Sequence, residues 1–225
     1  MSTRPSTFAP LLAALVLGLP GCQKARANEA PALPDASIAA PLTVAAGRDS
    51  VVFAGGCFWG VEAVFERVKG VTSVVSGYAG GTVANPSYEM VSSSRTGHAE
   101  AVKIVYDPSV VSYAQLLKIF FSVAHDPTQL NYQGPDHGTQ YRSAIFYSSA
   151  EQKAQTEGYV AQLTQARTFR APIVTQVASW QTFWPAEDYH QGYYDQHPDQ
   201  YYIVVNDKPK VAALQQQFPA LYRAR

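Results

Sequence analysis

Two repeating patterns of apolar and polar positions run along the chain from residue 51 onward. Short runs rich in β-branched and aromatic residues stop at glycine, proline or aspartate, which is typical of strands, and they lie at residues 51–54, 71–76, 99–106, 143–147 and 173–178. Apolar residues three and four positions apart predict helices at residues 61–68, 113–125, 150–166, 188–197 and 211–218. A glycine-rich loop is expected at residues 77–81, directly after the second strand.

These strands and helices follow one another without the regular strand–helix–strand repeat of a parallel sheet. The order predicts an α+β sandwich, in which helices pack against one mixed β-sheet around a ferredoxin-like core. The 225 residues suffice for one ordinary domain with an extension, and we place that domain at residues 51–225.

The first 21 residues have the features of a bacterial export signal. Arg4 and the amino terminus supply a basic start, and residues 8–19 are apolar but shorter than the roughly 20 residues that span a membrane. The stretch ends in Leu-Pro-Gly-Cys22, which resembles a lipobox, where the signal is cleaved before a cysteine that then carries lipid. The alternatives are an ordinary cleaved signal and an uncleaved helix, with Cys22 incidental in both.

Residues 22–50 are rich in alanine and proline, and their apolar positions show neither the spacing of a helix nor that of a strand. Such a segment buries too little apolar surface to offset its ordering entropy, so we expect a disordered tether. The N-terminal region therefore predicts an exported protein in the periplasm or cell envelope, which touches the membrane only through lipidated Cys22.

Composition excludes several classes of protein. Seventeen basic and seventeen acidic residues leave no basic surplus, which argues against a nucleic-acid partner. Two cysteines, Cys22 and Cys57, are too few for a disulfide framework. The histidines lie in separate segments without the spacing of a ligand set, so no metal is expected. We expect a monomer.

Cys57 follows a strand and two glycines and opens a helix. Glycine allows a sharp turn there, and the amide groups at a helix N-terminus favour a thiolate over a thiol. An isolated cysteine is more often an inert apolar residue of the core. The strand–Gly–Gly–Cys–helix order, with Phe58 and Trp59 directly afterwards, instead indicates a nucleophile.

The run Gly-Gly-Cys-Phe-Trp-Gly at residues 55–60 resembles the signature of A-type peptide methionine sulfoxide reductases. Further blocks continue the resemblance in the order of that family, at residues 77–81, 85–88, 97–102, 106–108, 125–128, 133–143 and 186–191. The resemblance spans roughly residues 51–205, which is nearly all of the predicted domain.

The resemblance implies the reduction of methionine S-sulfoxide, in proteins, peptides or the free amino acid, as a repair of oxidative damage. Cys57 would attack the sulfoxide sulfur and become a sulfenic acid. Glu100 would be the acid that protonates the sulfoxide oxygen, from an apolar pocket that raises its pKa above about 4.3. A solvated carboxylate on a strand is the alternative for Glu100, but its neighbours Ala99 and Ala101 favour burial.

Other site residues also come from the resemblance. Tyr88 and Tyr141 match tyrosines whose hydroxyls hold the sulfoxide oxygen, and Asp136 matches a carboxylate that orders the site. Taken alone, either tyrosine would more often be an amphipathic core residue, because the chain has fourteen of them.

The substrate methyl group is expected to lie against Phe58 and Trp59, since aromatic faces accept sulfur-bearing methyl groups. His190 matches a histidine near the site of the family. Plain core packing competes with this role for Phe58, and a structural histidine is the alternative for His190.

The C-terminal region departs from many members of the family, which carry resolving cysteines in a glycine-rich tail. Residues 199–211 contain no cysteine, so the chain resembles the single-cysteine branch. No cofactor is expected, and the sulfenic acid would be reduced by an external thiol, such as a thioredoxin-like or glutaredoxin-like protein. Cys22 is the only internal candidate, and lipidation would remove it.

Two alternatives from other classes fit a reactive cysteine. A redox sensor would oxidise Cys57 as a signal without turning over a substrate. A cysteine hydrolase would need a histidine base with an orienting Asn or Asp, and no block of the sequence resembles such a family.

Overall fold

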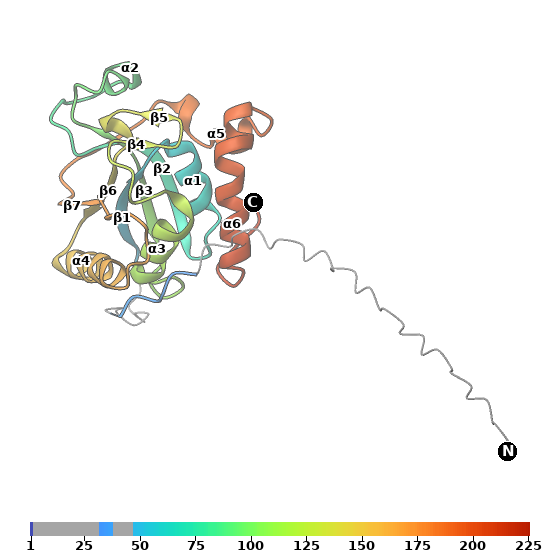
Figure 1. Ribbon diagram of the computed structural model, residues 1–225. Helices are drawn as coiled ribbons and strands as arrows, with labels where there is room; N and C mark the ends of the chain where they lie inside the picture. The colour runs from blue at the N-terminus through green and yellow to red at the C-terminus, as the bar shows by residue number, and fades with distance from the viewer. Residues whose placement is uncertain (2–31, 38–46) are drawn as a thin grey trace. The chain divides into compact units, whose positions relative to one another are not determined.

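The computed structural model describes residue 1 and residues 32–37 and 47–225 (Figure 1). The chain divides into two units, residues 1–31 and 32–225, and the second unit holds every helix and strand that the structure describes. The predicted export signal, Cys22 and most of the predicted tether lie outside the described residues.

Six strands form the main sheet in the order β7-β6-β1-β3-β2-β8, and β4 and β5 form a separate hairpin (Figure 1). The bounds are β1 (Asp49–Gly55), β2 (Val71–Ala79), β3 (Ala99–Tyr106), β4 (Tyr132–Gln133), β5 (Asp136–His137), β6 (Ser143–Tyr147), β7 (Gln176–Ser179) and β8 (Phe183–Pro185). All pairs in the main sheet are antiparallel except β6 with β7. The predicted α+β fold with one mixed sheet is confirmed.

Helices connect and flank these strands. The α-helices are α1 (Phe58–Glu66), α2 (Tyr88–Ser92), α3 (Tyr113–Ile119), α4 (Ala150–Gln165), α5 (Tyr193–Gln196) and α6 (Lys208–Gln217). Two π-helical turns, η1 (Phe120–Ala124) and η4 (Ile203–Asp207), adjoin α3 and α6, and two 3₁₀ turns are η2 (Thr139–Tyr141) and η3 (Asp188–His190). The order β1-α1-β2-β3-α3-β6, with the four strands arranged β6-β1-β3-β2, is the split βαβ arrangement of a ferredoxin-like core.

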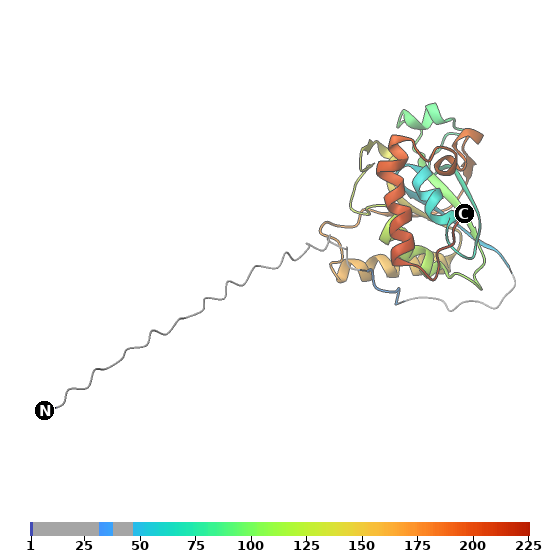
Figure 2. The ribbon, with the colours of Figure 1, turned by 90° about the vertical axis from the view of Figure 1, so that its right-hand side faces the viewer.

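Strand alternation gives the sheet two apolar faces. On β1, Val51 and Phe53 join the main core, to which α1, α3, α4 and α6 all contribute buried side chains. Val52 and Ala54 face the other way, into a smaller cluster with Ala101 and other short side chains. The helices therefore cover one face, and α6 lies beside α1 in both views (Figures 1 and 2).

Local chemistry explains where the elements begin. Ser112 starts α3 with a capping box, because its hydroxyl accepts from the Gln115 amide while the Gln115 side chain accepts from the Ser112 amide at 2.8 Å. Ser149 caps α4 by accepting from the Gln152 amide at 3.1 Å. Strands β3 and β6 have the bounds that the sequence predicted.

The structure differs from the sequence prediction where tertiary contacts override local signals. Strand β2 continues through Gly77, Tyr78 and Ala79, because Tyr78 is fully buried and pairs with β3, so the predicted loop begins only at Gly80. The predicted helix 188–197 is interrupted by Gly192, whose φ is +61°. The pattern missed α2, β8 and the β4–β5 hairpin, which are too short to show a period.

Residues 32–37 differ from the predicted disordered tether, since they pack on the domain. Leu33 is 7% exposed, the Pro34 carbonyl accepts from the Tyr159 hydroxyl at 2.8 Å, and Asp35 pairs with Lys118 at 2.7 Å. Contacts with α3 and α4 therefore hold this short segment in place. Across the described part of the chain, none of the helices has the length and apolar character needed to cross a membrane.

Candidate active site

Cys57 lies at the N-terminus of α1, directly after β1. Gly56 makes the turn with φ +90°, and a Cβ there would lie 2.6 Å from Gln133. A Cβ on Gly55 would lie 3.0 Å from both His125 and Phe120. The two glycines therefore let the chain pass between the β4–β5 hairpin and the residues of and after η1, and Cys57 directly after them is buried, with 8% of its surface exposed.

The environment of Cys57 favours a thiol in the free protein. Burial raises the pKa of Cys57 well above 9.0, and the negative charges of Glu100, once this group is ionised above about pH 8, and of Asp207 raise it further. The Trp59 amide and the Lys210 ammonium lower it, but by less. The helix N-terminus therefore lowers the pKa of Cys57, as the sequence predicted, but burial and two carboxyl groups outweigh this contribution.

Glu100 reaches the same helix end from β3. Its side chain is 2% exposed, and Oε2 accepts a hydrogen bond from the Phe58 amide at 3.1 Å. Burial raises the pKa of Glu100 to about 8; the Phe58 amide lowers it, and the Asp136 charge raises it. The carboxyl group is therefore protonated at neutral pH and can donate that proton beside Cys57.

Tyr88 and Tyr141 come from α2 and η2, and both lie close enough to Glu100 and Cys57 to interact with them electrostatically. Burial raises the pKa of both hydroxyls, and the charges of Glu100 and Cys57 raise it further. Both tyrosines therefore remain protonated hydrogen-bond donors beside the acid and the thiol. The structure brings the four residues together, as the sequence-based hypothesis requires.

Glu187 fixes the first turn of α2 to the sheet. One oxygen accepts from the Tyr88 amide and the other from the Tyr78 hydroxyl, each at 2.8 Å. Tyr78 is fully buried on β2, where it pairs with Glu100 of β3. The position of Tyr88 is thus coupled to the strand pair that carries the acid, a connection that no sequence pattern indicated.

Aromatic rings form one wall of the site. The Trp59 indole donates from Nε1 to Nδ1 of His190 at 3.1 Å and stacks on Tyr193 with centroids 3.8 Å apart. His190 also contacts Phe58 and Tyr88, with centroids 4.9 Å and 4.6 Å away. Burial lowers the pKa of His190, so the ring is neutral and, because Nδ1 accepts, Nε2 carries the proton.

Asp136 joins the β4–β5 hairpin to the C-terminal region. The Tyr202 hydroxyl donates to Asp136, and the Tyr202 ring meets Trp59 edge-on at 5.9 Å. Tyr193 and Tyr202 were not predicted, because nothing in the sequence distinguishes them among fourteen tyrosines. They lie more than 130 positions from Trp59, and only the fold shows the contact.

Two remaining features have structural explanations. His125 is half-buried between Phe120, which it stacks on at 4.0 Å, and the Ser143 hydroxyl at 2.7 Å, and the loss of solvent around its ring lowers its pKa to about 4. Within residues 32–37 and 47–225, no three His, Cys, Asp or Glu side chains gather as a metal site. The acid, the thiol and the phenols are thus the chemical groups of this site.

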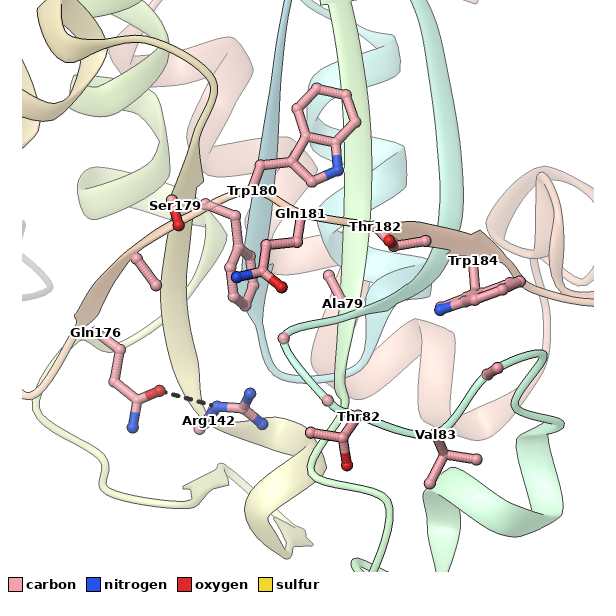
Figure 3. Close-up of a pocket in the computed structure, with 15 residues that line it drawn as sticks. Ala79, Thr82, Val83, Arg142, Gln176, Ser179, Trp180, Gln181, Thr182 and Trp184 are labelled. Atoms are coloured by element: carbon pink, nitrogen blue, oxygen red, sulfur yellow. Dashed lines mark hydrogen bonds between the residues drawn. The ribbon is translucent and has the colours of Figure 1, made fainter.

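A hollow of about 600 Å³ lies elsewhere, on the sheet face that carries the smaller apolar cluster (Figure 3). Trp180 and Trp184 line it, together with Arg142, whose Nε donates to Gln176 Oε1 at 3.1 Å (Figure 3). Arg142 also donates to the carbonyl oxygens of two neighbouring turns. None of the candidate catalytic residues lines this hollow, so it is separate from the site at Cys57.

Comparisons with known proteins agree with this geometry. A family model described as peptide methionine sulfoxide reductase matches residues 49–221. The chain is 57% identical over 178 residues to peptide methionine sulfoxide reductase MsrA 2 of Mesorhizobium japonicum. The aligned region covers 79% of this chain and 91% of the relative. It is 51% identical over 183 residues to the MsrA 2 of Synechocystis, which covers 81% of this chain and 86% of the relative.

Solved structures are similar as well. Methionine sulfoxide reductase A of Corynebacterium diphtheriae matches with a TM-score of 0.61 and 35% identity, over 70% of this chain and 79% of that chain. Mxr1 from Saccharomyces cerevisiae in its reduced form matches with a TM-score of 0.61 and 32% identity, over 69% of this chain and 89% of that chain.

Proposed function

This chain belongs to the peptide methionine sulfoxide reductase family, and we propose that Cys57 is its nucleophile and Glu100 its acid. The protein is an oxidoreductase that reduces methionine sulfoxide to methionine. The observation that supports the assignment is the geometry at the start of α1. There the amide next to Cys57 hydrogen-bonds to a buried carboxyl group whose pKa is about 8.

The reaction begins with the sulfoxide oxygen between Glu100 and the hydroxyls of Tyr88 and Tyr141. Glu100 transfers its proton to that oxygen, and the two hydroxyls stabilise the charge that develops on it. Protonation makes the sulfoxide sulfur electrophilic, and the Cys57 sulfur attacks it while the thiol proton returns to Glu100. This attack forms an S–S bond between Cys57 and the substrate. The hydroxyl group then passes from the substrate sulfur to the Cys57 sulfur while the S–S bond breaks, the electron pair of that bond stays on the methionine sulfur, and Cys57 becomes a sulfenic acid.

The aromatic wall supports the binding of the substrate methyl group. Phe58 is buried and Trp59 half-buried, and His190 and Tyr193 hold the Trp59 ring in one orientation. A methyl group on these faces would leave the sulfoxide oxygen directed toward the acid, and the resemblance to the family implies that the S sulfoxide is the epimer reduced. Oxidised proteins, peptides and the free amino acid all carry this group.

An external thiol reductant completes the cycle. Cys57 is the only cysteine in the described part of the chain, and the C-terminal region 199–225 has none. One thiol of a thioredoxin-like or glutaredoxin-like protein displaces water from the sulfenic acid and forms a mixed disulfide. A second thiol then releases Cys57 and leaves the reductant as a disulfide.

We further propose that the protein is exported and anchored in the cell envelope as a monomer. Export and anchoring are supported by the sequence of residues 1–21, the lipobox-like Leu-Pro-Gly-Cys22 and the alanine- and proline-rich stretch after it. Mass spectrometry of the mature N-terminus tests the anchor: a lipidated Cys22 supports it, and a free Cys22 thiol contradicts it.

An activity assay tests the catalytic assignment. Methionine sulfoxide in a peptide, with dithiothreitol as the reductant, is expected to yield methionine with the wild type and none with Cys57→Ser. Cys22→Ser is the matched control and should retain full activity. Undiminished activity of Cys57→Ser would exclude Cys57 as the nucleophile. Oxidation of Cys57 without any methionine formed would favour the redox sensor.

A further inference from the structure

Asp207 is a fully buried carboxylate to which the proposed reaction gives no role. It lies where η4 meets α6, and its side chain has no exposed surface. Oδ1 lies 3.1 Å from the Lys210 ammonium, while Oδ2 is buried and makes no hydrogen bond to any described residue. A buried carboxylate with one oxygen unpartnered is costly for folding, which points to a role for Asp207 beyond packing.

The Asp207–Lys210 pair lies against the first turn of α1. A Cβ on Gly60 would overlap the Asp207 carboxylate and would lie 2.9 Å from Lys210 Nζ. Gly60 does not have a positive φ, so the close approach of this pair, and not the backbone conformation, explains the glycine. The helix that Gly60 belongs to begins directly after Cys57.

We propose that Asp207, held by Lys210, is a positioning residue that acts through Cys57 and sets how readily this thiol loses its proton. The proposal rests on the assignment of Cys57 as the nucleophile. The two charges act in opposite directions, because a nearby carboxylate disfavours a thiolate and a nearby ammonium favours it. Keeping Cys57 as a thiol also protects it from peroxide until the substrate arrives, since the thiolate is the form that oxidises.

Other elements contribute further groups to the same region, and a test must separate their effects. Several titratable groups interact electrostatically with Cys57. They come from β3, α2, η2 and the C-terminal region, and they are Glu100, Tyr88, Tyr141, Tyr202, Asp207 and Lys210. The groups that interact electrostatically with Asp207 are Lys210, Asp136, Cys57, Tyr194 and Tyr202. Removing each charge of the Asp207–Lys210 pair separately leaves all the other groups in place.

The experiment measures the rate of Cys57 alkylation by iodoacetamide between pH 7 and pH 11. The full chain carries Cys22→Ser, which leaves Cys57 as its only thiol. One charge nearby changes a pKa by about one unit or more, which is tenfold in the thiolate fraction below the pKa. Asp207→Asn is therefore expected to be alkylated about tenfold faster at pH 8, and Lys210→Met more slowly by a smaller factor, because the Lys210 charge affects Cys57 less than the Asp207 charge does.

The opposite signs distinguish this role from a structural one. Loosened packing would expose Cys57 and accelerate alkylation in both variants. Loss of charge instead moves the pH at which alkylation accelerates, to lower pH in Asp207→Asn and to higher pH in Lys210→Met. The double variant is expected to return toward the wild type. Lys118→Met is the matched control, because it removes the ammonium of a pair with Asp35 and should leave the profile unchanged.

Circular dichroism confirms that each variant is folded before its profile is compared. Shifts in the same direction in both single variants, or no shift in either, would overturn the proposal. An unfolded Asp207→Asn would leave Lys210→Met to decide, and an unchanged profile there would also overturn it. Alkylation does not require methionine sulfoxide, so opposite shifts in a protein that fails to reduce it would support this inference while refuting the proposed function.

Discussion

Replacing Glu100 by glutamine is expected to stabilise the protein at alkaline pH while it abolishes turnover. Burial raises the pKa of Glu100 from 4.5 to about 8, with a further contribution from the Asp136 charge. In the unfolded chain the carboxyl group has its ordinary pKa, so between these two pH values the native state holds a proton that the unfolded state has lost. The contribution of Glu100 to stability is therefore fully present at low pH and is lost as the pH rises through about 8.

The size of this effect follows from the two pKa values. They differ by about 3.5, and at 1.36 kcal/mol for each pKa unit the loss is about 5 kcal/mol at pH 9. Glutamine has no proton to lose there, and its carbonyl oxygen keeps the hydrogen bond from the Phe58 amide. We expect Glu100→Gln to match the wild type near pH 4.5 and to exceed its free energy of unfolding by about 5 kcal/mol at pH 9.

Urea unfolding followed by tryptophan fluorescence at pH 5, 7 and 9 measures the difference. Burial raises the pKa of Glu62 to about 7, but this residue is present in both proteins, so its contribution cancels. Glu89→Gln, an exposed carboxylate of α2, is the matched control and should follow the wild type at every pH. A Glu100→Gln variant that loses stability with pH as steeply as the wild type would show that Glu100 does not carry the buried proton.

Three further predictions follow from the site. In the wild type, kcat/KM is expected to fall as the pH rises through about 8, because Glu100 loses the proton that it donates, and a flat profile from pH 6 to 10 would contradict that role. Tyr141→Phe should lower kcat/KM about 10- to 100-fold, since it removes a hydrogen bond worth about 1.5–3 kcal/mol to a developing charge; unchanged kcat/KM in a folded variant would remove Tyr141 from the mechanism. Gly60→Ala should lower the free energy of unfolding by about 1–3 kcal/mol through its overlap with Asp207, although alanine is the better helix former by about 1 kcal/mol. A stabilised Gly60→Ala would contradict that close approach.

Local patterns predicted much of the fold correctly. Strands 99–106 and 143–147 have the predicted bounds, because an alternating or continuous apolar run identifies a buried strand without help from distant residues. The predicted helix at 150–166 appears as α4, Ala150–Gln165. The elements that were missed contain two to five residues, and such a length is too short to show a period.

The position of Cys57 between β1 and α1, and the family to which the chain belongs, were both determined by the sequence, because each depends on residues in consecutive order. The ionisation of the Cys57 thiol was decided by the tertiary structure. Glu100 and Asp207 approach from 43 and 150 positions away, and together with burial they reverse the preference that the helix end alone would give. The same holds for Tyr193, since no local pattern records which of many tyrosines stacks on Trp59. Charge and packing act through space, and only the folded chain establishes those distances.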